Sequence, residues 1–552
     1  MGKKIVLGVL AAAVLLGGLA YLMRVDIVLY LAANRGLPEV GPNRAIEWQT
    51  PDPARAAKAK EGAPNIIFIL ADDMGINDVS TFGGGMDDGR MKTPHIDSLA
   101  TDGASFTQAY AGTGSCAPSR AMIMTGRYPS RTGFEFTPTP EGMAPLVRMI
   151  ASSMDNGLPE FYQPPQTSER QLSYEEQGLP GSEVTVAEVL QDAGYHTVHI
   201  GKWHLGRGEE FDATAQGFDE SLLMASGLFL PEDDPNVVNA KVDFDPIDQF
   251  LWARMQYAAS YNNSEWFEPG GYITDYWTDE AQKVIRANKD NPFFLYLAHW
   301  GIHTPLQATR EDYEAVGDIK PHRARVYAAM MRAVDRSVGD IIETLEEEGI
   351  ADNTIIVFSS DNGGAGYIGL PDVNAPYRGW KLTLFEGGIR VPMLMRWPDQ
   401  IAAGTQIASP VAHIDLMPTL AAAGGASVPD TVELDGKDLL PLATGATTED
   451  PHDAIFWTSA HYRVVRQGDW KLQLSERPNK AWLFNLGEDP TEQTNLADQN
   501  SAKLAELTAL LDAHSASARP PLYTHQGELP IAIDKTLAER YEEGDELIFW
   551  PN

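Results

Sequence analysis

The chain has 552 residues, of which 43% are hydrophobic, and a formal net charge of -35 at neutral pH. This length accommodates one large domain and a smaller one, and the apolar content is ample for a packed core, so general disorder is excluded. The acidity excludes nucleic acid as a partner, because nucleic-acid-binding proteins need basic surface. It also means that an anionic substrate requires a locally cationic pocket.

The N-terminus predicts a membrane anchor. Lys3 and Lys4 precede an apolar stretch over residues 5–23 that ends at Arg24, and about 20 such residues can cross a bilayer. The stretch is longer than the apolar core of most signal peptides, and no small-x-small cleavage site follows it. We therefore expect an exported protein, periplasmic or on the cell surface, held in the membrane with the two lysines inside. A cleaved signal peptide is the alternative for residues 1–35, and residues 36–62 are expected to form a linker.

From residue 63 onward, short apolar runs alternate with amphipathic helical stretches. Strands that alternate with helices predict an α/β domain whose large, mostly parallel sheet is covered on both faces. We assign this domain to residues 63–450. The strand-like runs are residues 65–70, 195–200, 292–298 and 354–358, and the helical patterns cover residues 184–193 and 326–342.

After about residue 450 the pattern changes to short strands separated by close turns, at residues 454–457, 461–465 and 470–474. Such spacing predicts a small antiparallel sheet. A helical pattern follows near residues 501–514. We expect residues 451–552 to form a smaller C-terminal domain.

Polar side chains follow four of the predicted strands directly. In open α/β sheets the ligand lies beyond the carboxyl ends of the strands. Polar residues after one strand would be usual for a surface loop, whereas polar residues after four strands predict a functional site. The residues are Asp72 and Asp73, Lys202 and His204, His299 and His303, and Asp361 and Asn362.

Two of these strand ends carry hard oxygen ligands. Asp72, Asp73, Asp361 and Asn362 suit Ca²⁺, or alternatively Mg²⁺, rather than Zn²⁺. Either pair alone would be interpreted as a turn or a helix cap. Together, each at a strand end, they predict a metal site.

The chain has a single cysteine, Cys116, so no intramolecular disulfide can form. Pro118 suits a first helical turn and Gly126 a helix end, so Cys116 is expected at a helix N-terminus, where backbone N–H groups favour negative charge. Arg120 follows one turn later and can reach the same side. A buried apolar role and a thiolate nucleophile are both open for this cysteine at this point.

The segment around Cys116 resembles the signature of type I, formylglycine-dependent sulfatases, in which Cys-x-Pro-Ser-Arg is followed by Thr-Gly. The resemblance covers nearly the whole chain from Asn65, in the family's order. It implies the alkaline-phosphatase-like sandwich fold and arylsulfatase-like hydrolysis of sulfate monoesters. The further matching segments are GKWHLG at 201–206, SDNGG at 360–364, RGWK at 378–381, EGGIRVP at 386–392, HIDLMPT at 413–419, and WLFNL at 482–486 with DPTE at 489–492.

The resemblance also implies a chemistry for residue 116. A maturation enzyme would convert Cys116 to formylglycine (3-oxoalanine), whose hydrate attacks sulfur with the help of the cation. His204 would deprotonate the second hydroxyl and so expel sulfate. Lys202, Lys381 and Arg120 would offset charge on the sulfonyl oxygens. The leaving-group proton would come from His303 or Lys381.

The identity of the alcohol is open, because phenolic, choline and carbohydrate sulfates all satisfy the resemblance. A phosphonate or phosphate ester hydrolase with the same nucleophile and metal is the first alternative function. A metal-stabilised binding protein without activity is the second, and an enzyme that uses Cys116 as an ordinary thiol is the third.

Overall fold

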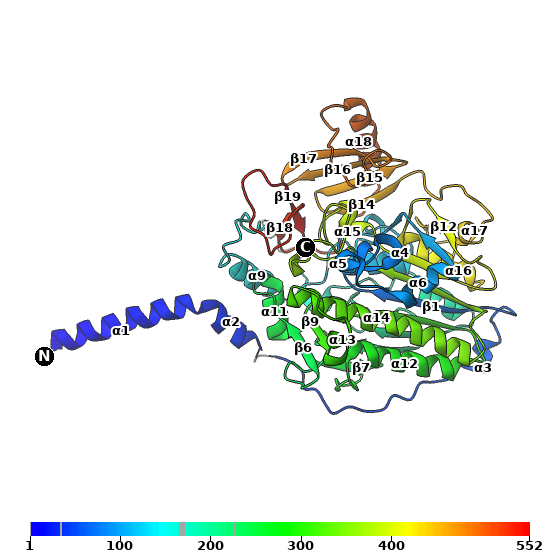
Figure 1. The fold of residues 1–552 in the computed structure, drawn as a ribbon, viewed down its shortest axis with the longest axis horizontal. Helices are drawn as coiled ribbons and strands as arrows, with labels where there is room; N and C mark the ends of the chain where they lie inside the picture. Colours follow the sequence, from blue (N-terminus) through cyan, green and yellow to red (C-terminus); the bar gives the residue numbers. More distant parts are fainter. Residues whose placement is uncertain (1, 34–35, 141, 165–171, 226) are drawn as a thin grey trace.

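The computed structural model describes residues 2–33, 36–140, 142–164, 172–225 and 227–552. Within these residues the largest sheet is a nine-stranded mixed one, with helices on both faces (Figure 1). Its strand order is β12-β2-β11-β10-β1-β8-β4-β5-β7. The strands are β1 (Asn65–Ala71), β2 (Ala104–Phe106), β4 (His196–Gly201), β5 (Glu220–Met224), β7 (Ala259–Tyr261), β8 (Phe293–Ala298), β10 (Thr354–Ser360), β11 (Met393–Arg396) and β12 (Thr405–Ile407).

The centre of this sheet is parallel. Strand β1 pairs in parallel with β10 on one side and β8 on the other, and β8, β4 and β5 continue the parallel arrangement. Every residue of β1 is buried, as expected of a strand covered on both faces. Antiparallel pairs occur only towards the edges in the described sheet, at β10–β11, β11–β2 and β5–β7. The predicted α/β fold with a mostly parallel central sheet is therefore confirmed.

The two faces of the sheet belong to two hydrophobic cores. Ile67 and Ile69 of β1 pack into the core beneath α6 (Pro94–Thr101), α12 (Ile273–Asn288) and α14 (His322–Glu347). Ile66, Phe68 and Leu70 pack into the other core, beneath α7 (Cys116–Thr125), α10 (Val186–Asp192) and α16 (Leu416–Ala423). This alternation along β1 is the period of two that a strand imposes on its side chains.

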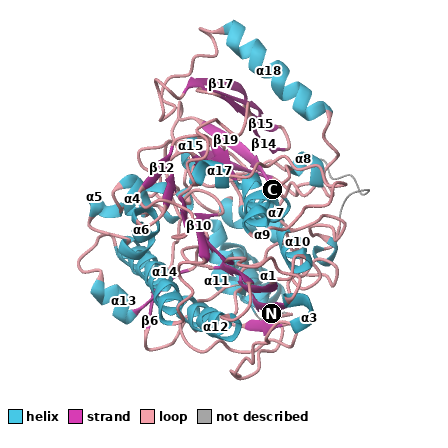
Figure 2. Cartoon of the chain, turned by 90° about the vertical axis from the view of Figure 1, so that its right-hand side faces the viewer, coloured by secondary structure: helices cyan, strands magenta, loops and turns pink. Residues whose placement is uncertain are grey.

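The C-terminal part is a small antiparallel sheet with a helix against it (Figure 2). Strands β14 (Ile455–Ser459), β15 (Tyr462–Gln467), β16 (Trp470–Glu476) and β17 (Asn479–Asn485) pair in sequence order, followed by α18 (Ser501–Ala516). The predicted C-terminal antiparallel sheet is thus confirmed. Lys471 of β16 is fully buried and forms ion pairs of 2.9 Å with Glu386 and 3.0 Å with Glu492. The pair with Glu386 links this sheet to the larger part.

Further short elements surround the two sheets. They are α3 (Pro53–Ala56), α4 (Ser80–Gly83), α5 (Met86–Gly89), β3 (Ala109–Tyr110), α8 (Pro129–Thr132), α9 (Met143–Ala151), β6 (Val237–Ala240), α11 (Pro246–Arg254), β9 (Leu306–Thr309), α13 (Arg310–Ala315), α15 (Glu386–Ile389), β13 (Val411–Ala412), α17 (Leu440–Ala443), and the hairpin of β18 (Glu528–Ala532) with β19 (Leu547–Pro551).

The N-terminus forms two helices, α1 (Gly2–Leu22) and α2 (Arg24–Ala33). Helix α1 projects away from the globular part (Figure 1), and its residues 5–22 are long and apolar enough to cross a membrane, a property that signal sequences share. The segment after α2 lies against the globular part. The Gln256 side chain donates to the Pro38 carbonyl at 3.0 Å, Gly41 pairs with Trp266, and Arg55 forms an ion pair with Asp219.

Candidate active site

The predicted site residues meet at the carboxyl edge of the central sheet. Asp72 and Asp73 follow β1, and Asp361 and Asn362 follow β10. Lys202 and His204 follow β4, and His303 lies in the loop after β8. Because parallel strands end at the same edge, four loops from distant parts of the sequence come together.

Two of these residues adopt an unusual backbone conformation. Asp73 has a φ of 63° and His204 a φ of 65°. Non-glycine residues rarely adopt this region, and where they do the strain is held by the surrounding structure, commonly at functional sites. The folded scaffold therefore fixes the direction of both side chains.

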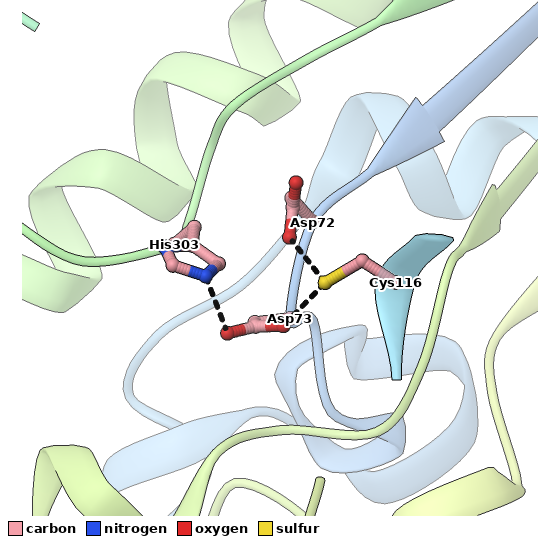
Figure 3. Close-up of side chains that lie close together, drawn as sticks. All are labelled: Asp72, Asp73, Cys116 and His303. Carbon is pink, nitrogen blue, oxygen red and sulfur yellow. Dashed lines mark hydrogen bonds and ion pairs between the residues drawn. The ribbon is translucent and has the colours of Figure 1, made fainter. Parts of the chain in front are cut away.

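Cys116 occupies the first position of α7, as the sequence predicted, and is only 4% exposed. Its sulfur lies 3.6 Å from Asp72 Oδ1 and 3.9 Å from Asp73 Oδ1 (Figure 3). Burial, together with the nearby Asp361 carboxylate, raises the pKa of the Cys116 thiol well above its usual value. The unmodified thiol is therefore held in its protonated, poorly nucleophilic form.

The acidic side chains around Cys116 are matched by buried cations. Arg120 is fully buried and bridges Asp361 Oδ2 at 2.9 Å and Asp72 Oδ2 at 3.0 Å. Lys202 Nζ lies 2.5 Å from Asp72 Oδ2, and Lys381 Nζ lies 2.7 Å from Asp73 Oδ1. A buried charge is tolerated only when it is paired in this way.

Replacing Arg120 with methionine is expected to destabilise the fold by about 3–5 kcal/mol, the cost of breaking a buried pair and leaving its partners uncompensated. Chemical denaturation would measure the change in the free energy of unfolding. Arg463→Met is the matched control, because the Arg463–Asp512 pair is partly exposed, at 28% and 61% of the two side chains, and exposed pairs contribute up to about 1 kcal/mol. Equal effects of the two substitutions would contradict the buried bridge.

The residue types of the cluster match a hard divalent cation. Asp73 accepts from Asn362 Nδ2 at 2.8 Å, and its backbone N–H donates to Asp361 Oδ1 at 3.3 Å. Asn362 Oδ1 is buried and has no hydrogen-bond partner among the described residues. A buried amide oxygen without a donor, beside three carboxylates, is the kind of acceptor that a cation such as Ca²⁺ could satisfy.

The structure also gathers a partly different set of ligand atoms. One ligand atom each from Asp72, Asp73, Cys116 and His303 lie within 4.8 Å of one another (Figure 3). Cys116 and His303 were predicted as catalytic residues rather than as ligands. All four predicted ligands nevertheless lie close to residue 116. Asp72 and Asp73 contact Cys116, and Asp361 and Asn362 contact Asp73.

The three histidines differ in their surroundings. His303 stacks on Trp300 with ring centroids 4.1 Å apart and lies 3.5 Å from Asp73 Oδ2. Burial lowers the pKa of His303 to about 3, so its ring is neutral at neutral pH. His299 instead contacts the Ser337 hydroxyl of α14 at 2.9 Å. His204 lines the cavity above Cys116, and its buried Nδ1 has no partner in the described part of the chain.

Tyr367 and Trp300 belong to the site but were not predicted. The Tyr367 hydroxyl donates to Asp73 Oδ2 at 2.6 Å and accepts from Lys381 Nζ at 3.0 Å. The ring of Trp300 lies 4.7 Å from Lys202 Nζ. The available signals were the glycine-rich loop that carries Tyr367 directly after Asn362, and the position of Trp300 between the two histidines of one loop.

A cavity of about 300 Å³ opens above Cys116. A second cavity of about 200 Å³ shares several of its walls, including Ile247, Tyr367 and Leu529. Leu529 and Asn552 bring the C-terminal segment to the first cavity. The C-terminal segment therefore completes the wall of the site.

Comparison with known proteins gives consistent results. The family model Sulfatase matches residues 64–426, and the model "N-sulphoglucosamine sulphohydrolase, C-terminal" matches residues 379–517. Human steryl-sulfatase is 30% identical over 502 residues, covering 77% of each chain. Mouse N-acetylgalactosamine-6-sulfatase is 31% identical over 486 residues, covering 86% of this chain and 84% of the mouse protein. The crystal structure of Ps i-CgsB superposes with a TM-score of 0.67 at 32% identity, covering 84% of this chain and 94% of that one.

Proposed function

Because the chain belongs to the sulfatase family and is a sulfuric ester hydrolase, we propose that it cleaves sulfate monoesters at residue 116. The observation that carries the proposal is that Asp72 and Asp73 contact Cys116. Arg120 and Lys202 in turn pair with Asp72 and bring positive charge beside the same residue. The substrate is a sulfated small molecule or carbohydrate that gives an alcohol and inorganic sulfate.

The nucleophile is residue 116 after oxidation of its side chain to formylglycine by a maturation enzyme. The raised pKa of the buried thiol supports this, because an unmodified Cys116 would stay protonated beside Asp72 and Asp73. The hydrated aldehyde offers one hydroxyl for attack on sulfur and a second through which sulfate is expelled. Mass measurement of the peptide that spans residue 116 distinguishes the aldehyde from the intact thiol.

The side chains that would hold Ca²⁺, or Mg²⁺ in its place, are Asp72, Asp73, Asp361 and Asn362. The ion would supply Lewis-acid stabilisation of negative charge on oxygen. Three carboxylates in the cluster are matched by the three cations Arg120, Lys202 and Lys381. A divalent cation would therefore leave the site positive, which reconciles an anionic substrate with a net charge of -35.

The remaining side chains stabilise negative charge on the substrate and supply the leaving-group proton. Arg120, Lys202 and Lys381 offset charge on the sulfonyl oxygens. Burial alone would lower the pKa of Lys381, but the Asp73 carboxylate raises it, and the resulting pKa lies well above its usual value. Since His303 is neutral at neutral pH, Lys381 is the better of the two candidates for holding the leaving-group proton. Neutral His303 then orients Asp73 and the substrate.

His204 is the proposed base for sulfate release. Burial and the neighbouring Lys202 and Arg120 hold the pKa of His204 well below its usual value of 6.5. The ring is therefore neutral and competent at pH 7. We expect kcat to stay level as the pH is lowered through 6.5 and to fall only well below pH 6.5, where His204 gains a proton.

Replacing His204 with alanine is expected to lower kcat by about 10²–10⁴-fold, the usual contribution of a general base. Steady-state rates measured from about pH 8 down to the lowest pH at which the protein stays folded would measure both the lower kcat and the loss of its fall at low pH. His322→Ala is the control, because His322 is exposed and contacts Tyr313 away from the site. A His204→Ala enzyme with an unchanged pH profile would exclude this role.

The test of the proposed function is parallel assay of 4-nitrophenyl sulfate and a 4-nitrophenyl phosphonate ester, using protein co-expressed with a maturation enzyme. Sulfate ester hydrolysis should dominate kcat/KM. The phosphonate or phosphate alternative has weaker support, because both curated relatives described above are sulfatases by name. Higher kcat/KM for the phosphonate would reverse the assignment.

We also propose that the protein is exported and anchored through residues 5–23, with residues 36–62 as the connecting segment. The catalytic unit would comprise residues 63–450 and the C-terminal unit residues 451–552. The exposed apolar surface of α1 supports the anchor. Fractionation of cells followed by N-terminal sequencing would distinguish an intact anchor from a cleaved signal.

A further inference from the structure

Helix α11 forms a wall of the active-site cavity and also packs against the second N-terminal helix, α2. Ile247, Phe250 and Leu251 of α11 line the cavity above Cys116. The same helix packs against α2. Figure 1 shows α2 beside α11, on the flank of the globular part from which α1 extends.

Helix α2 has two apolar sides. Val25, Val28 and Leu29 are half-buried, at the spacing of one helical face. Ile27, Tyr30 and Leu31 are exposed, at 41%, 69% and 41% of their surface, and Asp26 is the exposed acidic residue of this helix. An apolar surface that continues directly from a candidate membrane span matches the interfacial region of a bilayer.

The distance between the span and the cavity wall is short. The apolar residues 5–22 end two positions before α2 begins at Arg24. Ten residues of helix rise only about 15 Å. Arg24 lies over the ring of Tyr21 at 4.4 Å, a basic and aromatic pair typical of the membrane–water interface. Only the short helix α2 therefore separates the candidate membrane span from α11.

The cavity wall on this side is apolar. Beyond the sulfate-binding end, it is lined by α11 together with Met143 of α9, Met224 of β5, and Met255. Of the described residues lining this cavity, none has a carboxylate side chain, and Arg207 is the only charged side chain away from the sulfate end. Arg207 donates to the Ala225 carbonyl and lies 5.7 Å from the ring centroid of Tyr174. These two contacts partly stabilise its charge.

We propose that the cavity takes the sulfate esters of amphiphilic alcohols that reside in the membrane, with the apolar part of the alcohol against α11. This inference rests on the proposed sulfate ester hydrolysis and adds to it the class of alcohol and the direction of delivery. The cationic end beside Cys116 holds the sulfate, and the apolar wall holds the hydrocarbon. The preference among alcohols then depends on how much apolar surface is buried against the wall, rather than on hydrogen bonds to hydroxyl groups of the alcohol.

The test uses full-length, aldehyde-bearing protein in phosphatidylcholine vesicles and a series of 4-alkylphenyl sulfates from methyl to heptyl. The leaving group is nearly constant across the series, so only the apolar contact changes. We expect kcat/KM to rise about two- to fourfold for each added methylene until the wall is covered. A flat series, or higher kcat/KM for a sulfated monosaccharide than for the heptyl ester, would overturn the inference.

Delivery from the membrane is tested with a 4-hexadecylphenyl sulfate, whose long chain makes transfer between vesicles slow. Initial rates are compared for enzyme and ester in the same vesicles and for enzyme and ester in separate, mixed vesicles. The rate should be much higher when they share vesicles, and equal rates would show uptake from water and would overturn the membrane route.

Two variants of α11 separate the apolar wall from general damage. Phe250→Ala should flatten the dependence on chain length and lower kcat/KM for the heptyl ester at least tenfold. Gln249→Ala is the matched control, because Gln249 lies on the same helix, lines neither cavity and donates to the Asp243 carbonyl. Equal slopes in the wild type and Phe250→Ala would contradict the assigned wall. If the wild type hydrolyses neither the alkylphenyl sulfates nor the sulfated monosaccharide, the proposed function itself is rejected.

Discussion

Replacing Cys116 with alanine is expected to lower kcat for a sulfate ester by roughly 10⁵-fold or more, the scale on which a covalent nucleophile contributes. The neighbouring cations would still bind the sulfate group, since Arg120 and Lys202 are held by Asp72 and not by residue 116. KM should therefore change much less than kcat. Steady-state rates on 4-nitrophenyl sulfate and a thermal unfolding curve would separate lost chemistry from lost folding.

The serine variant gives a sharper result. Cys116→Ser keeps one hydroxyl, which can accept sulfate once but has no second hydroxyl with which to expel it. We expect one equivalent of alcohol per enzyme, followed by arrest, and a sulfated peptide in the mass spectrum. Continuous turnover by Cys116→Ser, or full activity of wild-type protein whose Cys116 thiol is intact, would contradict the proposed nucleophile.

The arrangement of the central sheet was predictable because its strands are strongly patterned. The run from Asn65 is apolar on both faces and is entirely buried, and the residues after it and after β10 come together as parallel topology requires. The edges were not predictable. Strands β2 and β12 have three residues each, too few for an apolar period to be recognised, and their pairing depends on tertiary contacts.

Site residues that belong to local sequence motifs were predictable. Site residues that tertiary packing brings to the site were not. Asp72, Lys202 and Asp361 each follow a buried strand, so topology brings them to one edge. Tyr367 lies in a glycine-rich loop whose path depends on contacts with the rest of the fold. The C-terminal segment reaches the cavity through Leu529 and Asn552, a long-range contact that no local pattern encodes.

Replacing Asp73 with asparagine is expected to lower the affinity for Ca²⁺ at least about 100-fold, because losing even an outer-shell partner costs 10–100-fold. Burial alone would raise the pKa of Asp73, but Lys381, His303 and Lys202 hold it below its usual value. The carboxylate is therefore anionic in the folded protein. Calorimetric titration of chelator-treated protein would measure the affinity, and activity against Ca²⁺ concentration would give an independent value.

The matched control for Asp73→Asn is Asp372→Asn, which removes a charge from a neighbouring loop whose carboxylate accepts from the backbone of Asp87. If Asp73 is a ligand, excess Ca²⁺ should restore part of the activity of Asp73→Asn, and Asp372→Asn should titrate like the wild type. Asp73 also anchors Lys381 and Tyr367, so a purely structural role would lower thermal stability without moving the Ca²⁺ midpoint. A lowered melting temperature with an unchanged midpoint would therefore exclude Asp73 from the metal site, because a ligand's loss must appear in the binding curve.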